Sequence, residues 1–234
     1  MARITKDPAE RRDELLDIAL GLCREHGFET MNVEQVTRAA GVAKGTFYHY
    51  FASKEEMLEQ LVQRFGDALF QSLVSAVPGA GATGAERLRA IMNAAAEYKL
   101  AQADIAYASF LYHAGNLPLR HRLFATWRGQ ARHVLMPVIR DGVADGSFSV
   151  VNADCATDIV LMLWFDAADQ LWERALLAPD ADSFVATMLH GAAAIYQAQE
   201  RVLGLPDGTF ELPEGSELIA LTTQLFHSID RNHP

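Results

Sequence analysis

The sequence of 234 residues predicts an all-α protein. Apolar residues recur every three or four positions through most of the chain, which is the spacing of one face of a helix. Helix-capping side chains and helix-ending glycines and prolines interrupt this pattern repeatedly. No run is long enough for a strand, and residues 148–151 fit an extended connection. We expect an N-terminal domain over residues 1–53 and a larger helical domain over residues 54–234.

The first two helices have clear start and stop signals. Asp7 can cap a helix that has Pro8 in its first turn, and leucines at helical spacing continue this helix to Gly27. Asn32, with a glutamine three residues later, predicts a capping box that starts a second helix. This helix should end at Gly41, where glycine permits a tight turn.

A third short helix is expected over residues 44–51, directly after that turn. Ser53, with Glu56 three residues later, predicts the capped start of a longer fourth helix. The fourth helix should end before residues 78–82, whose proline and glycines predict a flexible joint.

The rest of the chain predicts five or six further helices. Thr83 starts the first of them with another capping box. Breaks are expected at residues 115–118, Gly146, Pro179 and residues 204–206, where glycines and prolines gather.

Composition and motifs exclude several classes of protein. Charges interrupt every apolar run well before the roughly 18 residues of a membrane span, and no signal-peptide core is present. We therefore expect a cytoplasmic protein without a membrane partner. Cys23 and Cys155 lack the spacing of a zinc site, so we interpret them as buried thiols and expect no metal. Residues 83–234 contain no catalytic or nucleotide-binding motif, which argues against an enzyme and a cofactor.

The distribution of charge favours a nucleic-acid partner, although the net charge of −10 does not. Phosphate binding is largely electrostatic, so a strongly acidic chain is an unusual DNA-binding protein. Residues 38–54, however, contain three basic side chains and no Asp or Glu, which leaves one local basic window.

The third helix has one apolar and one polar face. Phe47 and Phe51 lie four residues apart, so both should face the core. The outward positions then hold Lys44, Gly45, Tyr48 and His49. The lysine and histidine offer donors to bases, the glycine permits close approach, and the tyrosine can reach a phosphate. This face predicts a recognition helix for double-stranded DNA.

Residues 28–58, FETMNVEQVTRAAGVAKGTFYHYFASKEEML, resemble the helix-turn-helix signature of the TetR family of bacterial regulators. The resemblance implies that Lys44, Gly45 and His49 meet base edges. It also implies a phosphate-binding set of Asn32, Thr46, Tyr48, Tyr50 and Lys54. Ala43 departs from the family, which often has a capping serine there, so a cap worth about 1 kcal/mol is missing.

Aromatic and methionine residues on successive helices of the larger domain suggest a ligand cavity. The resemblance makes a small apolar or aromatic effector plausible. Our candidate contacts are Tyr107, Phe110, His113, Trp127, Met162, Trp164, Phe165 and Asp166. A cationic ligand would fit the aspartates of this region, whereas Arg128 and Arg132 would suit an anion.

One short recognition helix contacts too few base pairs for specificity, so we expect a homodimer on a palindromic operator. We expect the interface between the two subunits, the dimer seam, on helices at about residues 154–177 and 182–203. Its candidate residues are Ile159, Leu163, Phe184, Met188, Gly191, Ala192 and Ile195. The sequence thus favours a repressor released by its effector. The alternatives are an activator or ligand-independent regulator, and an enzyme or scaffold that keeps the N-terminal motif only for packing.

Overall fold

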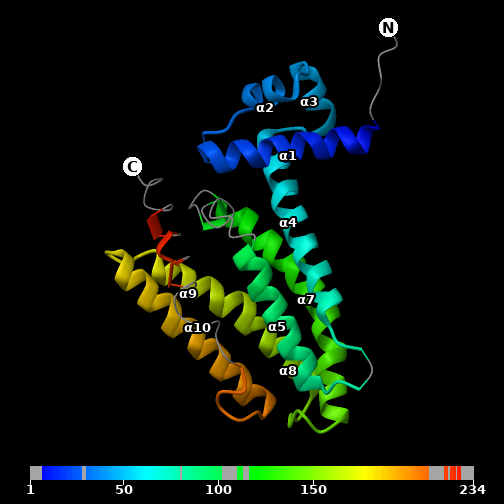
Figure 1. The fold of residues 1–234 in the computed structure, drawn as a ribbon, viewed down its shortest axis with the longest axis vertical. Coiled ribbons are helices and arrows are strands. Elements are labelled where there is room, and N and C mark those ends of the chain that lie inside the picture. The colour runs from blue at the N-terminus through cyan, green and yellow to red at the C-terminus, as the bar shows by residue number, and fades with distance from the viewer. Residues whose placement is uncertain are drawn as a thin grey trace.

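The structure is a computed structural model that describes residues 7–27, 30–79, 81–101, 110–112, 116–210, 219–220, 222–224 and 226–227. Helices dominate these ranges, and no strand occurs within them, which confirms the all-α prediction (Figure 1). A small helical unit sits at one end of the long helix α4 (Lys54–Ala76), and the larger helical part lies along and beyond the rest of it.

The small unit contains α1 (Pro8–His26), α2 (Val33–Ala40) and α3 (Lys44–Tyr50). Asp7 caps α1 by accepting a hydrogen bond from the backbone N–H of Ala9 at 2.7 Å. The predicted capping box of α2 is present, because Asn32 and Gln35 each accept a hydrogen bond from the other's backbone N–H. Gly41 follows α2 with φ 65°, a left-handed conformation that glycine adopts without strain.

The next three helices are long and carry most of the core of the larger part. They are α4 (Lys54–Ala76), α5 (Gly84–Ala101) and α7 (Leu117–Ala144). Ser53 caps α4 through the backbone N–H of Glu56, and Thr83 caps α5 through that of Glu86, as predicted. The buried apolar cluster is continuous from α1 along α4 into α5 and α7. Helix α4 therefore joins the small unit to the larger part through packed side chains.

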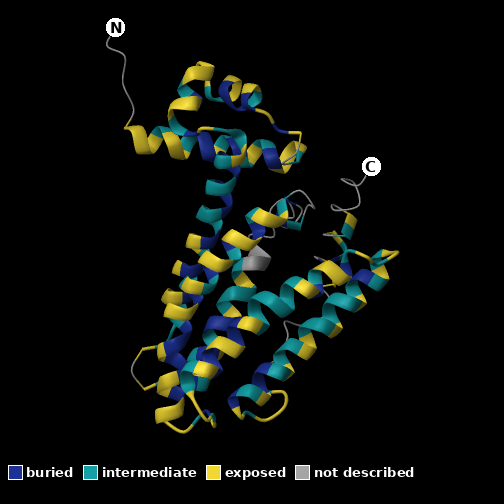
Figure 2. Cartoon of the chain, turned by 180° about the vertical axis from the view of Figure 1, so that it is seen from behind, coloured by how far each residue is buried: buried dark blue, intermediate teal, exposed yellow. Residues whose placement is uncertain are grey.

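The region expected to form one helix over residues 154–177 is divided by a change of helical type. Helix α8 (Ala153–Met162) continues into a π-helical turn, η2 (Leu163–Ala167), and then into α9 (Ala168–Ala175). Single π-turns inside α-helices are rare and often occur at functional sites. Helix α10 (Ala181–Leu203) packs against α9, and many of its residues are only partly buried (Figure 2).

Candidate nucleic-acid interface

Helix α3 is held by the inward face that its sequence predicts. Phe47 and Phe51 are 0% and 1% exposed, and their ring centroids lie 5.3 Å apart. The capped starts of α2 and α4 fix the chain on either side of this helix. The orientation of α3 is therefore set by core packing and does not depend on any contact of its outer face.

The opposite face of α3 is open to solvent. Lys44, Gly45, Tyr48 and His49 are all exposed, as predicted. Tyr48 is 50% exposed, and its ring meets the Phe47 ring edge-on at 5.3 Å. A Cβ at Gly45 would meet no atom within 4 Å, so the helix has open space at this position.

The expected phosphate-binding residues differ in exposure. Thr46, Tyr50 and Lys54 are partly buried, and Asn32 is exposed. The Asn32 side-chain oxygen accepts the hydrogen bond from Gln35 at 3.0 Å, and its amide nitrogen can still donate. The set combines hydroxyl, amide and ammonium donors, which are the groups that hold phosphates in protein–DNA complexes.

Two features at the start of α3 modify the sequence prediction. Ala43 provides no side-chain cap, as expected from its methyl group. Lys44 forms an ion pair with Glu34 of α2, although the window over residues 38–54 contains no acid. The hydrogen bond between the two side chains lowers the pKa of Glu34 and raises the pKa of Lys44. Sequence reasoning missed this acid because it lies ten residues before the lysine.

Comparison with known proteins decides the family. The sequence model described as "Bacterial regulatory proteins, tetR family" matches residues 15–61. The HTH-type transcriptional repressor KstR2 of Mycolicibacterium smegmatis is 32% identical over 156 residues, which cover 65% of this chain and 73% of its relative. KstR2 of Mycobacterium tuberculosis is 31% identical over 163 residues, covering 68% and 78% of the two chains. The chain belongs to the TetR family.

Solved structures share the fold of this TetR-family chain. The fatty acid degradation regulator FadR from Bacillus halodurans gives a TM-score of 0.57 at 20% identity, covering 85% of this chain and 96% of FadR. A TetR transcription regulator from Haloarcula marismortui gives 0.58 at 17% identity, covering 79% and 95%. These structures agree with the family in fold, and α2 and α3 lie within the residues matched by the family model.

In the larger part of this TetR-family chain, the candidate effector contacts divide into separate groups. Phe110 and Trp127 are buried, each 7% exposed, whereas Met162 is 56% exposed. Trp164, Phe165 and Asp166 lie in the π-helical turn η2. Tyr107 and His113 lie outside the described residues.

The two aromatic residues of η2 point to different neighbours. Phe165 meets Phe124 edge-on at 5.9 Å, and Phe124 also lies 5.8 Å from Trp127. Trp164 instead donates from Nε1 to Oε1 of Gln199 on α10 at 2.6 Å. Among the candidates that the structure describes, Trp127 and Phe165 are brought toward one another by the group around Phe124.

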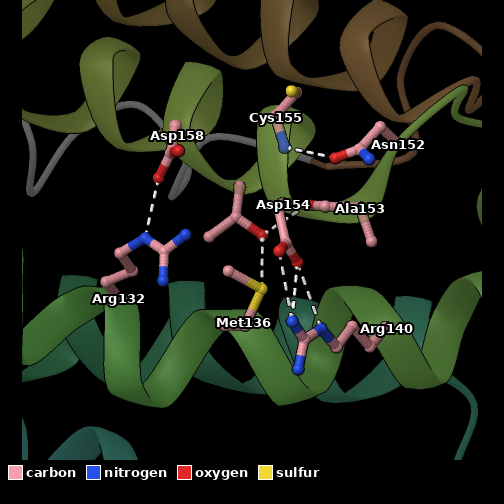
Figure 3. Close-up of polar contacts among 9 residues, drawn as sticks. Arg132, Met136, Arg140, Asn152, Ala153, Asp154, Cys155 and Asp158 are labelled. Carbon is pink, nitrogen blue, oxygen red and sulfur yellow. Dashed lines mark hydrogen bonds and ion pairs between the residues drawn. The ribbon is translucent and has the colours of Figure 1, made fainter.

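Two arginines of α7 form ion pairs with aspartates of α8. Arg132 and Arg140 of α7 pair with Asp158 and Asp154 of α8 at 2.8 and 2.9 Å (Figure 3). Farther along α7, Arg128 pairs with Asp166 of the adjoining turn η2 at 2.7 Å. The aspartates considered for a cationic ligand and the arginines considered for an anion are thus paired with each other. Antiparallel packing of α7 on α8 brings the opposite charges together.

The candidate residues of the dimer seam differ in how far their side chains are exposed to solvent. Ile159 is 45% exposed, and Leu163, Met188, Ala192 and Ile195 are partly buried. The prediction that Phe184 lies in the dimer seam is wrong. Phe184 is fully buried between Trp172 and Phe226 of its own chain, so it is a core residue. Gly191 already faces a neighbour within the chain, because a Cβ there would lie 2.2 Å from Cδ1 of Leu171.

Other expectations concern metals, thiols and membranes. Among the described residues, no group of three His, Cys, Asp or Glu side chains could hold a metal ion. Cys23 is buried, but Cys155 is exposed, so the expectation of two buried thiols is wrong for Cys155. No helix within the described ranges combines the length and apolar character needed to cross a bilayer.

Proposed function

We propose that this protein is a transcriptional repressor that binds a palindromic DNA operator as a homodimer. The observation that carries the proposal is the two-sided character of α3. Phe47 and Phe51 anchor the helix in the core, while Lys44, Tyr48 and His49 face solvent. The relatives from two mycobacterial species are named repressors, which favours repression over activation.

The roles of the individual residues follow from their chemistry. Lys44 and His49 would donate to base edges in the major groove, and Gly45 would let the backbone approach. Tyr48, which is half exposed, would donate from its hydroxyl to a phosphate and fix the position of the helix. The remaining phosphate contacts would be Asn32, Thr46, Tyr50 and Lys54.

The dimer would use the outer faces of α8 and α10. Ile159 and Met162 expose apolar surface on α8, and α10 is partly exposed along most of its apolar residues. A second copy packed on these helices would remove this surface from water. It would also place two copies of α3 on successive turns of the major groove.

An apolar or aromatic effector would act through the group of Phe124, Trp127 and Phe165. Trp127 Nε1 is buried and has no hydrogen-bond partner among the described residues, which is uncommon for a buried indole. A ligand that binds the DNA-incompatible dimer more tightly would release the operator, and operator DNA would weaken ligand binding equally.

The test begins with a duplex selected by the wild-type protein from a randomised library. Lys44→Ala and Tyr48→Phe should both weaken binding to this duplex and leave the circular dichroism unchanged. Tyr98→Phe, which removes a hydroxyl on α5, is the matched control. If both variants bind the duplex as the wild type does, α3 is not the recognition helix.

Two further measurements separate the alternatives. A promoter that carries the selected duplex should be less active when the protein is present, and an increase would identify an activator. Small molecules found by tryptophan fluorescence should release the duplex. Tight binders that leave DNA affinity unchanged would point to a ligand-independent regulator.

A further inference from the structure

The carboxylate of Glu34 lies on the same exposed surface as the basic residues of α3. Its partner in the structure is Lys44, the first residue of α3, and the two side chains are 56% and 55% exposed. Because DNA phosphates are negative, a carboxylate beside the recognition helix opposes their binding. Its presence calls for an explanation other than general solubility.

The backbone positions of both residues are fixed locally. Glu34 lies in the first turn of α2, which begins at the Asn32 capping box, and an acid there interacts favourably with the helix dipole. Lys44 lies in the first turn of α3, next to the uncapped Ala43. The ion pair therefore links the N-terminal ends of the two helices that form the helix-turn-helix.

The pair contributes little to folding, because both charges remain in contact with water. Its electrostatic effect on binding is larger. A lysine that binds a phosphate displaces a condensed counterion from DNA, and this release drives non-specific association. A lysine already neutralised by a carboxylate gives up that partner when it binds a phosphate, so it gains less from the exchange.

We propose that Glu34 is a specificity-determining residue that keeps Lys44 from binding phosphates of non-specific DNA. Lys44 leaves Glu34 only where the duplex offers well-placed acceptors, such as the O6 and N7 atoms of a guanine in the major groove. This inference rests on the proposed function, since it requires α3 to be the recognition helix. Glu34 acts through Lys44 and need not contact DNA itself.

The test compares Glu34→Gln with the wild type on two duplexes. One is the selected duplex, and the other is a mixed-sequence duplex of equal length. Glu34→Gln should bind the mixed duplex about two- to five-fold more tightly, the range expected for loss of an exposed ion pair. The slope of log affinity against log salt should steepen by about 0.9 for each half-site. The ratio of specific to non-specific affinity should fall.

Glu86→Gln is the matched control, because Glu86 is also exposed and lies in the first turn of a helix, α5, which carries none of the proposed DNA or dimer contacts. It changes the net charge by the same amount and should leave the slope of log affinity against log salt unchanged on both duplexes. In a Lys44→Ala background, Glu34→Gln should have a much smaller effect, because no lysine remains to be released. Circular dichroism and the thermal unfolding midpoint check that each variant is folded.

The outcomes separate this inference from the proposed function. If the wild type binds DNA, Lys44→Ala weakens it, and Glu34→Gln changes neither the salt slope nor the ratio, then the inference is wrong and the function stands. Weaker binding of both duplexes by Glu34→Gln would also overturn it, because Glu34 would then only position Lys44. If Lys44→Ala binds both duplexes as the wild type does, the proposed function fails first.

Discussion

Trp127 of α7 packs its indole directly against Gly66 of α4. A Cβ added at Gly66 would lie 2.0 Å from Nε1 and 2.4 Å from Cε2 of Trp127, so only a glycine allows the indole to lie there. Trp127 is 7% exposed. Two polar contacts flank this packing, Arg122 to Glu59 at 3.1 Å and Gln130 to Asp67 at 2.8 Å. Movement of α7 would therefore be transmitted to α4, which leads to the helix-turn-helix.

Gly66→Ala should destabilise the protein. Alanine favours a helix interior by about 1 kcal/mol relative to glycine, but overpacking against a buried indole costs about 1–3 kcal/mol. We expect a net loss of up to about 2 kcal/mol in the free energy of unfolding, measured by urea denaturation. Gly129→Ala on α7 is the control, because a Cβ there meets nothing within 4 Å. The control should gain about 0.5–1 kcal/mol. A similar gain for Gly66→Ala would show that the indole moves without cost.

The sequence was sufficient for features that depend on neighbours within one or two turns. The capping box of Asn32 and Gln35 joins residues three apart, and the buried face of α3 follows from two phenylalanines four apart. Such patterns determine local geometry directly. The fold class and the exposed face of α3 were predicted correctly for this reason.

Features that depend on tertiary packing could not be predicted in the same way. The spacing of Phe184 is the same whether it faces its own chain or a partner, and the structure buries it against Trp172. In the sequence, the aspartates of α8 and the arginines of α7 each form the polar face of a separate helix. The antiparallel packing of the two helices, which the sequence pattern does not reveal, brings them together as ion pairs. The π-turn η2 inserts a shift in register for which the apolar pattern has no signal.

Arg120→Ala should be far more damaging than the removal of an exposed arginine. Arg120 is 3% exposed, and it pairs with Asp169 at 3.0 Å and Glu173 at 2.5 Å. Its guanidinium also lies 4.6 Å from the centre of the Tyr112 ring. Loss of one partner leaves the partly buried Asp169 uncompensated, which costs about 3–5 kcal/mol in buried pairs.

Arg132→Ala is the matched variant, because its pair with Asp158 is largely exposed. We expect it to lose less than about 1 kcal/mol. Urea denaturation of both variants measures the difference. Equal losses would mean that Arg120 contributes no more than a surface ion pair.

Asp145 should make stability depend on pH in the acid range. Hydrogen bonds from Ser147, and then from the backbone N–H of Gly84, lower the pKa of the Asp145 carboxyl below its ordinary value of 3.8. A folded-state pKa below the unfolded value means that stabilisation is complete above the unfolded pKa and is lost as pH falls through the folded one. Asp145→Asn should therefore lower the urea midpoint by a constant amount between about pH 5 and pH 7. The difference should shrink below about pH 4. If it stays constant down to about pH 2, the carboxylate charge plays no part.

Ile159→Asp should convert the proposed dimer into a folded monomer. Ile159 is 45% exposed on α8, and Met162, one turn along the same face, is 56% exposed. If a second copy covers this face, an aspartate there would bury an unpaired charge, and association would lose several kcal/mol. Sedimentation at micromolar concentration should give one subunit for Ile159→Asp and two for the wild type. Its circular dichroism should remain that of a folded helical protein, because the side chain is not part of the core of its own chain.

Val74→Asp provides the control for this substitution, since Val74 is 59% exposed near the end of α4, outside the proposed seam. It introduces the same charge in place of an exposed apolar side chain and should remain a dimer. The monomeric variant should also bind the selected duplex much more weakly, because one recognition helix contacts only one half-site. If Ile159→Asp remains a dimer, the dimer seam lies elsewhere on the molecule. If the wild type is a monomer, the proposed homodimer is wrong.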